Sequence, residues 1–186
     1  MRIRCGRIQL KGVAVYQRVD RFMNGLSAWL ALLGGVVLVG LTVMTVVSIV
    51  GRTFNRFGLG PVPGDFEIIE MGAAFAIFAF LPWCQYRRGH VTVDIFMARF
   101  GEKVNFAIDV IANALMTLAA AIMLWRLTLG MLDKHAYHET SFILQFPIWW
   151  GYAASMVGAV AFLLISAFTV WRSFREYARA GAALNT

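Results

Sequence analysis

Four long apolar runs dominate the chain, and each is long enough to cross a lipid bilayer as a helix. They cover about residues 26–50, 68–86, 104–125 and 148–170. A hydrocarbon core of about 30 Å needs about 20 apolar residues in helical conformation. The pattern therefore predicts an all-α membrane protein with four transmembrane helices, built as a single membrane domain over residues 1–186.

Two shorter stretches mix apolar and charged positions, which is typical of helices that lie in the membrane interface. Residues 91–103 combine aliphatic and aromatic side chains with charged ones, and they are too few and too polar to span. An interfacial amphipathic helix is therefore predicted there, on the cytoplasmic side. Residues 8–22 carry a weaker version of the pattern. An ordinary charged loop is the alternative for both stretches.

Composition agrees with a membrane protein. The chain has 186 residues, 60% of them hydrophobic, with a mean hydropathy of +0.68. Soluble domains are about 45–50% apolar, and a domain of this size leaves much of its surface exposed. The net charge of +7 could suggest nucleic acid. Because the basic residues sit at the ends of the apolar runs, membrane lipids are the expected partners and nucleic acid is not.

The distribution of Lys and Arg predicts the orientation. The N-terminal segment, the connection between the second and third runs, and the C-terminal tail together carry 13 of the 17 basic residues. The other side holds Arg52, Arg56 and Lys134, with Arg126 at the margin of the third run. Cytoplasmic loops are enriched in Lys and Arg. Both termini are therefore predicted in the cytoplasm.

Ionisable and amide side chains within the apolar runs are candidate functional residues, because they are costly in lipid. Glu70 lies near the start of the second run, where a carboxylate reaches interfacial water and a favourable helix dipole. This shallow depth favours pairing with the cation of a partner subunit over ion coupling. Asn105, Asp109 and Asn113, with Thr117, recur every fourth residue and form one stripe on the third helix. The stripe either packs within the four helices or contacts another membrane subunit.

No sequence feature indicates chemistry. All three histidines lie outside the four apolar runs, whereas a membrane haem usually takes axial histidines from within the bundle. The chain also lacks a Gly-rich phosphate loop, a CxxC pair and an HExxH motif. The sequence therefore predicts no catalytic, metal-binding or cofactor-binding residue, and no enzyme activity.

The connection after the second run contains a recognisable signature. It reads Arg87-Arg88-Gly89-His90-Val91-Thr92-Val93-Asp94. This stretch resembles the signature of the small membrane subunit of TRAP transporters, the tripartite ATP-independent periplasmic carriers (the DctQ-like family). Further elements agree in order, namely Arg52 after the first run, Glu70 in the second, and Glu139-Thr140-Ser141 before Phe146-Pro147-Ile148-Trp149-Trp150. The resemblance covers about residues 52–152 by motif and nearly the whole chain by topology.

The resemblance implies a small scaffold subunit of a sodium-coupled, binding-protein-dependent transporter for organic acids. In that family a large multi-span permease subunit (M-type) moves substrate by an elevator-type movement, and a periplasmic solute-binding protein (P-type) captures it. The small subunit is expected to pack against the permease and to need no contact with substrate. The signature itself either contacts a partner or stabilises the subunit's own fold. The residues carried over as interface or structural candidates are Arg52, Glu70, Arg87, Arg88, Gly89, His90, Asp94, Asn105, Asp109, Asn113, Glu139, Thr140 and Pro147.

Other functions remain open at this stage. A membrane-anchor subunit of a redox complex would predict histidines within the spans. A stand-alone small exporter would use Glu70 for proton coupling and would transport solute without a partner. The small subunit of a tricarboxylate-type carrier shares the scaffold role, but the Gly89-His90-Val91-x-Val93-Asp94 element disfavours it.

Overall fold

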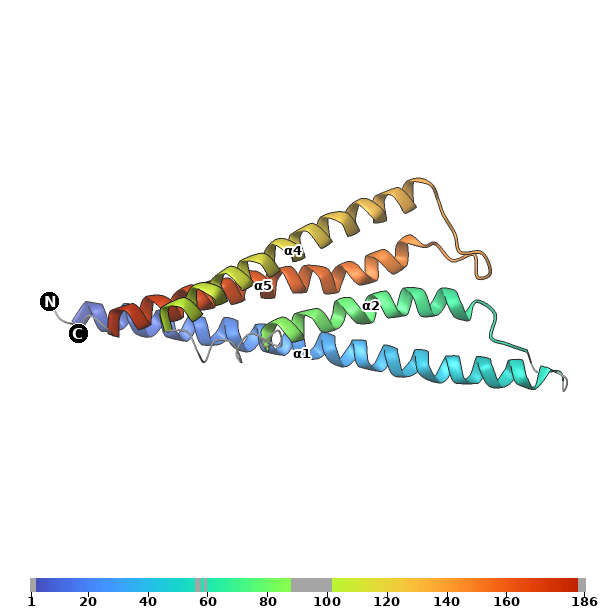
Figure 1. The fold of residues 1–186 in the computed structure, drawn as a ribbon, viewed down its shortest axis with the longest axis horizontal. Coiled ribbons are helices and arrows are strands. Elements are labelled where there is room, and N and C mark those ends of the chain that lie inside the picture. The colour runs from blue at the N-terminus through green and yellow to red at the C-terminus, as the bar shows by residue number, and fades with distance from the viewer. Residues whose placement is uncertain (1–2, 56–57, 59, 88–101, 184–186) are drawn as a thin grey trace.

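The structure, a computed structural model, consists of four long helices (Figure 1). It describes all residues except 1–2, 56–57, 59, 88–101 and 184–186. The helices are α1 (Ile3–Thr53), α2 (Asp65–Tyr86), α4 (Glu102–Ala136) and α5 (Trp149–Ala183). The predicted all-α class and its four long apolar helices are confirmed, because each helix contains a segment long and apolar enough to cross a membrane. These segments are Gln17–Thr53, Asp65–Tyr86, Val110–Ala136 and Trp149–Ser173.

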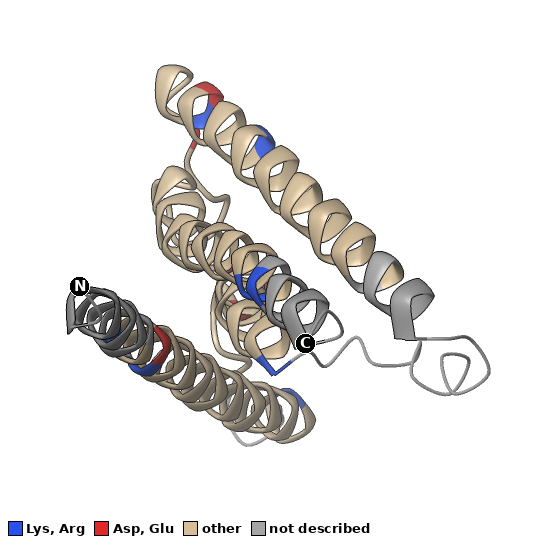
Figure 2. Ribbon diagram, turned by 90° about the vertical axis from the view of Figure 1, so that its left-hand side faces the viewer, with Lys and Arg blue, Asp and Glu red and all other residues tan. Residues whose placement is uncertain are grey.

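The helices form an open row instead of a closed bundle. α1 packs on α2, α2 on α5, and α5 on α4, whereas α1 touches α5 only slightly. A view along the helices places α1 and α4 at the two edges of the row, with α2 and α5 between them (Figure 2). The first residues of α1 and the last of α5 lie at one end, here called the termini end (Figure 1). The α1–α2 and α4–α5 connections lie at the opposite end, here called the loop end, where the helices spread apart.

Two boundaries differ from those predicted. The third span was expected to end at residue 125, but α4 continues to Ala136. A single arginine does not end a helix, because Arg, like the Leu residues that follow it, is a good helix former. Arg126, Lys134 and His135 therefore belong to α4.

The N-terminal segment differs as well. Residues 8–22 were expected to form a separate surface helix, but α1 is one unbroken helix over Ile3–Thr53 (Figure 1). The segment is therefore the N-terminal part of α1 and is continuous with the first span. The predicted interfacial helix over residues 91–103 lies almost entirely outside the described residues. Only Glu102 and Lys103 are described, as the start of α4.

α5 is the central helix, and small residues bring α2 against it. Half of the apolar window of α5 is buried inside the protein, compared with 6% of that of α4. Ala76 on α2 and Ala159 on α5 are almost fully buried, and small residues of this kind let membrane helices approach closely. A Cβ on Gly158 would lie 2.5 Å from the Phe78 carbonyl oxygen. Glycine at position 158 thus permits the closest approach of these two helices.

Candidate functional site

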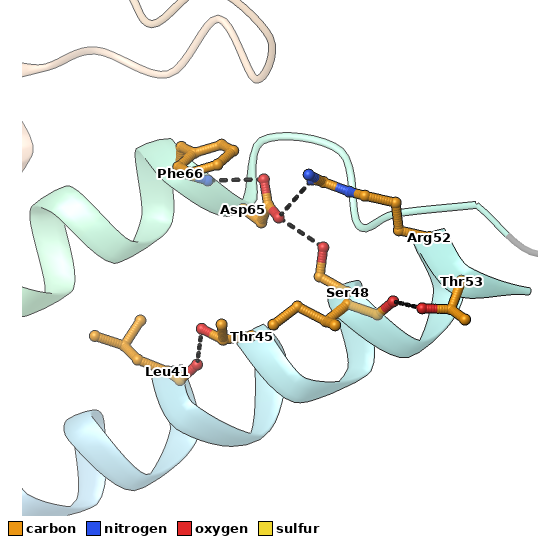
Figure 3. Close-up of polar contacts among 8 residues, drawn as sticks. Leu41, Thr45, Ser48, Arg52, Thr53, Asp65 and Phe66 are labelled. Atoms are coloured by element: carbon orange, nitrogen blue, oxygen red, sulfur yellow. Dashed lines mark hydrogen bonds and ion pairs between the residues drawn. The ribbon is translucent and has the colours of Figure 1, made fainter. Parts of the chain in front are cut away.

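A carboxylate joins α1 to α2 at the loop end (Figure 3). Asp65, the first residue of α2, is only 9% exposed. Its Oδ2 accepts a hydrogen bond from Ser48 Oγ at 2.6 Å and lies 3.7 Å from Arg52 Nη2. Its Oδ1 accepts the Phe66 N–H at 2.9 Å. Arg52, in the last turn of α1, therefore forms an ion pair within this chain, although its own side chain is exposed.

A second carboxylate, on α2, accepts hydrogen bonds from the connection between α4 and α5. Glu67, in the first turn of α2, accepts the Ile143 N–H at 2.8 Å through Oε1 and the Leu144 N–H at 3.1 Å through Oε2. Leu144 lies against Gly64, which has a φ of 75° and would bring a Cβ within 2.5 Å of the leucine Cγ. Because a side chain there would be strained and would clash, glycine lets this connection dock on the start of α2.

The α4–α5 connection has a defined shape of its own. Thr140 and Pro147 form an isolated antiparallel bridge, and the Ser141 N–H donates to the Phe146 carbonyl at 2.9 Å. The Lys134 ammonium lies 2.6 Å from Glu139 Oε2, which ties the end of α4 to the connection. The structure thus brings the predicted Glu139, Thr140 and Pro147 together as the residues that shape this loop.

The tip of the same connection exposes apolar side chains. Phe142 is fully exposed, and Ile143 and Leu144 beside it are largely exposed. Exposed apolar groups on a backbone held by hydrogen bonds are typical of a surface that meets another molecule. This segment is not among the candidate residues predicted from the sequence. Its run of three bulky apolar residues between polar ones was the available signal.

A cleft opens at the loop end between α2, α4 and α5, beneath the α4–α5 connection. Its volume is about 380 Å³. Glu70 lies at this cleft, and it makes no hydrogen bond or ion pair with any other described residue. Ser155 lines it too and is 1% exposed, and its Oγ has no hydrogen-bond partner in the part of the chain that the structure describes. The remaining lining residues are Glu67, Met71, Ala74, Phe78, Leu127, Ser141, Phe142, Ile148, Gly151 and Tyr152.

A buried polar cluster joins three helices. Gln85 on α2 is 2% exposed, and its Nε2 donates to Asn113 Oδ1 on α4 at 3.2 Å and to Thr169 Oγ1 on α5 at 3.0 Å. Asn113 Nδ2 in turn donates to Ser173 Oγ at 3.2 Å. Asn113 therefore packs within the four helices, as one of the two predicted interpretations of the stripe expects. Gln85 was missed, although a glutamine among apolar residues late in the second run was its signal.

The structure leaves other predicted residues untested. Arg87 is described, and its guanidinium carbon lies 4.6 Å from the centre of the Trp83 ring. Asn105 and Asp109 lie on α4, but their side chains are outside the described part of the structure. The rest of the signature also lies outside the described residues, namely Arg88, Gly89, His90 and Asp94.

The polar contacts found here join helices and shape a loop. Among the described residues, no three His, Cys, Asp or Glu side chains are grouped so that they could hold a metal ion. Four apolar helices with polar contacts of this kind define a multi-pass helical membrane protein. Within that class, a family model described as "Tripartite ATP-independent periplasmic transporters, DctQ component" matches residues 41–176.

The chain therefore belongs to the DctQ component family of the TRAP transporters, as the sequence resemblance indicates. It is a multi-pass membrane component of a transporter and not an enzyme. This membership replaces the redox-anchor, exporter and tricarboxylate-carrier alternatives. Comparison with curated proteins and with solved structures gave no significant match.

Proposed function

We propose that this chain is the small scaffold subunit of a sodium-coupled, binding-protein-dependent transporter for organic acids in a bacterial inner membrane. The family supplies the class of transporter. In this proposal the chain carries no substrate. It packs against the large multi-span permease subunit and enlarges the static frame against which the transport domain moves.

One observation carries the scaffold role, namely the uncovered apolar face of α4 on the side away from α5. Its large apolar side chains form a stripe spaced alternately by four and three residues along the helix. Such spacing presents one face to a neighbouring helix, and no other part of the described protein covers it. The stripe consists of Ile111, Leu115, Leu118, Ile122, Trp125, Leu129 and Leu132. We infer that a helix of the permease covers part of this stripe and that lipid covers the rest.

The orientation belongs to the same proposal. Both helix ends at the termini end lie on one side (Figure 1), and 13 of the 17 Lys and Arg residues belong to the segments on that side. Cytoplasmic segments are enriched in these residues. The termini end then faces the cytoplasm, and the α4–α5 connection with its apolar tip faces the periplasm. There the tip lies within reach of the periplasmic solute-binding protein.

A C-terminal affinity tag tests both parts of the proposal. In intact spheroplasts we expect protease to leave the tag uncut, because the C-terminus faces the cytoplasm. After mild solubilisation from a strain that expresses the whole transporter, the tag should co-purify one large permease polypeptide in equimolar amount. Cleavage of the tag in intact spheroplasts would contradict the orientation. Purification of the chain without any large membrane protein would contradict the scaffold role.

A further inference from the structure

The cleft between α2, α4 and α5 has a charge that nothing in its lining balances. Glu67 and Glu70 both lie at the cleft, and no Lys, Arg or His lines it. The Glu67 oxygens accept backbone N–H groups of the α4–α5 connection. The Glu70 carboxylate has no partner among the described residues, although it lies in the second turn of a candidate span. Carboxylates at membrane depth generally pair with a cation or lie in a water-filled cavity.

The cleft carries a second unsatisfied group, which lies deeper than Glu70, toward the termini end, because Gly151 packs against Met71 and Gly158 against Phe78. This group belongs to Ser155, in the second turn of α5. Its hydroxyl is buried without a hydrogen-bond partner in the described structure, which costs free energy. Three aromatic residues, Phe78, Tyr152 and the fully exposed Phe142, also line the cleft. A guanidinium group suits such a site best. It is a planar cation with several hydrogen-bond donors, so it can stack on aromatic rings while it donates to carboxylate and hydroxyl oxygens.

We propose that this cleft receives a basic side chain, an arginine or a lysine, from a membrane helix of the large permease subunit. The proposal rests on the proposed function, which supplies the partner. Leu127 of α4 lines the cleft and lies on the face of α4 opposite its exposed stripe. The helix that reaches the cleft therefore packs at the open side between α2 and α4, and it is a different contact from the one on the stripe. The side chain enters between α2 and α4, pairs with Glu70 and donates to Ser155. The contact fixes the depth of the permease helix relative to this subunit.

A phospholipid fits the site less well. An acyl chain satisfies the apolar walls but offers no donor to the Ser155 hydroxyl, and it leaves the Glu70 carboxylate unpaired inside a candidate span. An amine-bearing headgroup would reach Glu70 near the interface, but it brings its own negatively charged phosphate beside the Glu67 and Glu70 carboxylates. Lipid capture is therefore an outcome that the experiment below must distinguish from a protein contact.

The first test compares two charge-neutralising variants in the complete transporter. Glu70→Gln removes the proposed pair, and truncation of a buried charge pair typically weakens an association strongly. We expect at least about tenfold less permease to co-purify with Glu70→Gln than with the native chain. Asp133→Asn is the matched control, because Asp133 is an exposed acid at the loop end that does not line the cleft. It should retain native recovery, and equal recovery for both variants would overturn the proposal.

The second test identifies directly what lies at the cleft in the assembled transporter. The photo-reactive residue p-benzoylphenylalanine replaces Phe142, which is fully exposed and lines the cleft. The control places it at Phe66, an exposed phenylalanine at the start of α2 that does not line the cleft. We expect position 142 to cross-link to a permease peptide that contains Lys or Arg, and Glu70→Gln to abolish this product. A product with phospholipid alone, or with a permease peptide that lacks a basic residue, would overturn the proposal.

These outcomes distinguish failure of the proposed scaffold function from failure of the inference about the cleft. If the native chain recovers no permease, the proposed function fails before the cleft is tested. If the native chain recovers the permease and Glu70→Gln does so equally well, only the inference about the cleft fails.

Discussion

At the residue scale, polar side chains in this protein connect its own elements. Asp65 ties α1 to α2, Glu67 ties α2 to the α4–α5 connection, and Gln85 ties α2 to α4 and α5. In each case a buried or half-buried acceptor or donor meets a partner far away in the sequence. Hydrogen bonds of this kind contribute little individually to membrane proteins, about 0.6 kcal/mol on average. Their main effect is to fix which faces of the helices meet.

Asp65 and Arg52 allow a direct prediction about stability. Asp65→Ala removes the bond to Ser48, the ion pair with Arg52 and an acidic group at the start of α2. We expect it to lower the free energy of unfolding by about 1–3 kcal/mol, since it leaves the buried Ser48 hydroxyl without its acceptor. Arg52→Ala removes only an ion pair with an exposed arginine and should cost less than about 1 kcal/mol.

Thermal unfolding of both variants in the same detergent measures this difference. The native chain serves as the reference. If Arg52→Ala destabilised the protein as much as Asp65→Ala, the ion pair would be stronger than its exposure and its 3.7 Å separation allow.

Sequence reasoning found some of these residues and missed others for a physical reason. Arg52, Glu139, Thr140 and Pro147 belong to motifs that are close in the chain, so their importance was predictable. The hydrogen bonds between residues far apart in the chain were not predictable in this way. Asp65 meets a serine 17 positions away and Gln85 meets a threonine 84 positions away. Such pairs depend on which helix faces meet, and a single sequence does not contain that information.

At the element scale, helix existence was easier to predict than helix ends. The four apolar runs correspond to four helices because about 20 apolar residues suffice to cross the bilayer. The third apolar run was expected to end at about residue 125, whereas the helix that contains it, α4, continues through Arg126 to Ala136. Apolar runs report where lipid contact begins and ends, whereas a helix continues into water as long as its residues favour it.

The contact between α2 and α5 supports a prediction about packing. Gly158→Ala places a Cβ 2.5 Å from the Phe78 carbonyl oxygen, so the two helices must move apart. We expect a loss of about 1–3 kcal/mol, which is typical of overpacking. Gly40→Ala is the matched control on α1, where a Cβ would meet no atom within 4 Å. It should be neutral or stabilising by up to about 1 kcal/mol, because Ala favours helix over Gly.

Denaturation midpoints in one detergent compare the two alanine variants with the native chain. The packing account requires that only the Gly158 variant lose stability. Equal midpoints for both variants would show that α2 and α5 are not in the close contact described here.

At the scale of the whole molecule, the open row of helices is the feature that matters for function. A closed four-helix bundle buries one face of every helix, whereas this row leaves the edge helices α1 and α4 mostly uncovered. Sequence patterns predicted four spans, but they could not predict the order in which the spans pack. That order creates both the cleft at Glu70 and the uncovered stripe on α4, and these are the surfaces that a partner subunit can use.

The central claim is that this chain supports transport without performing it. Reconstitution into proteoliposomes with a sodium gradient tests this claim, using the purified chain alone, the permease with its binding protein, and all three components together. We expect no solute uptake by the chain alone and full sodium-dependent uptake only when all three are present. Uptake by the chain alone, or undiminished uptake by the other two components without it, would contradict the account.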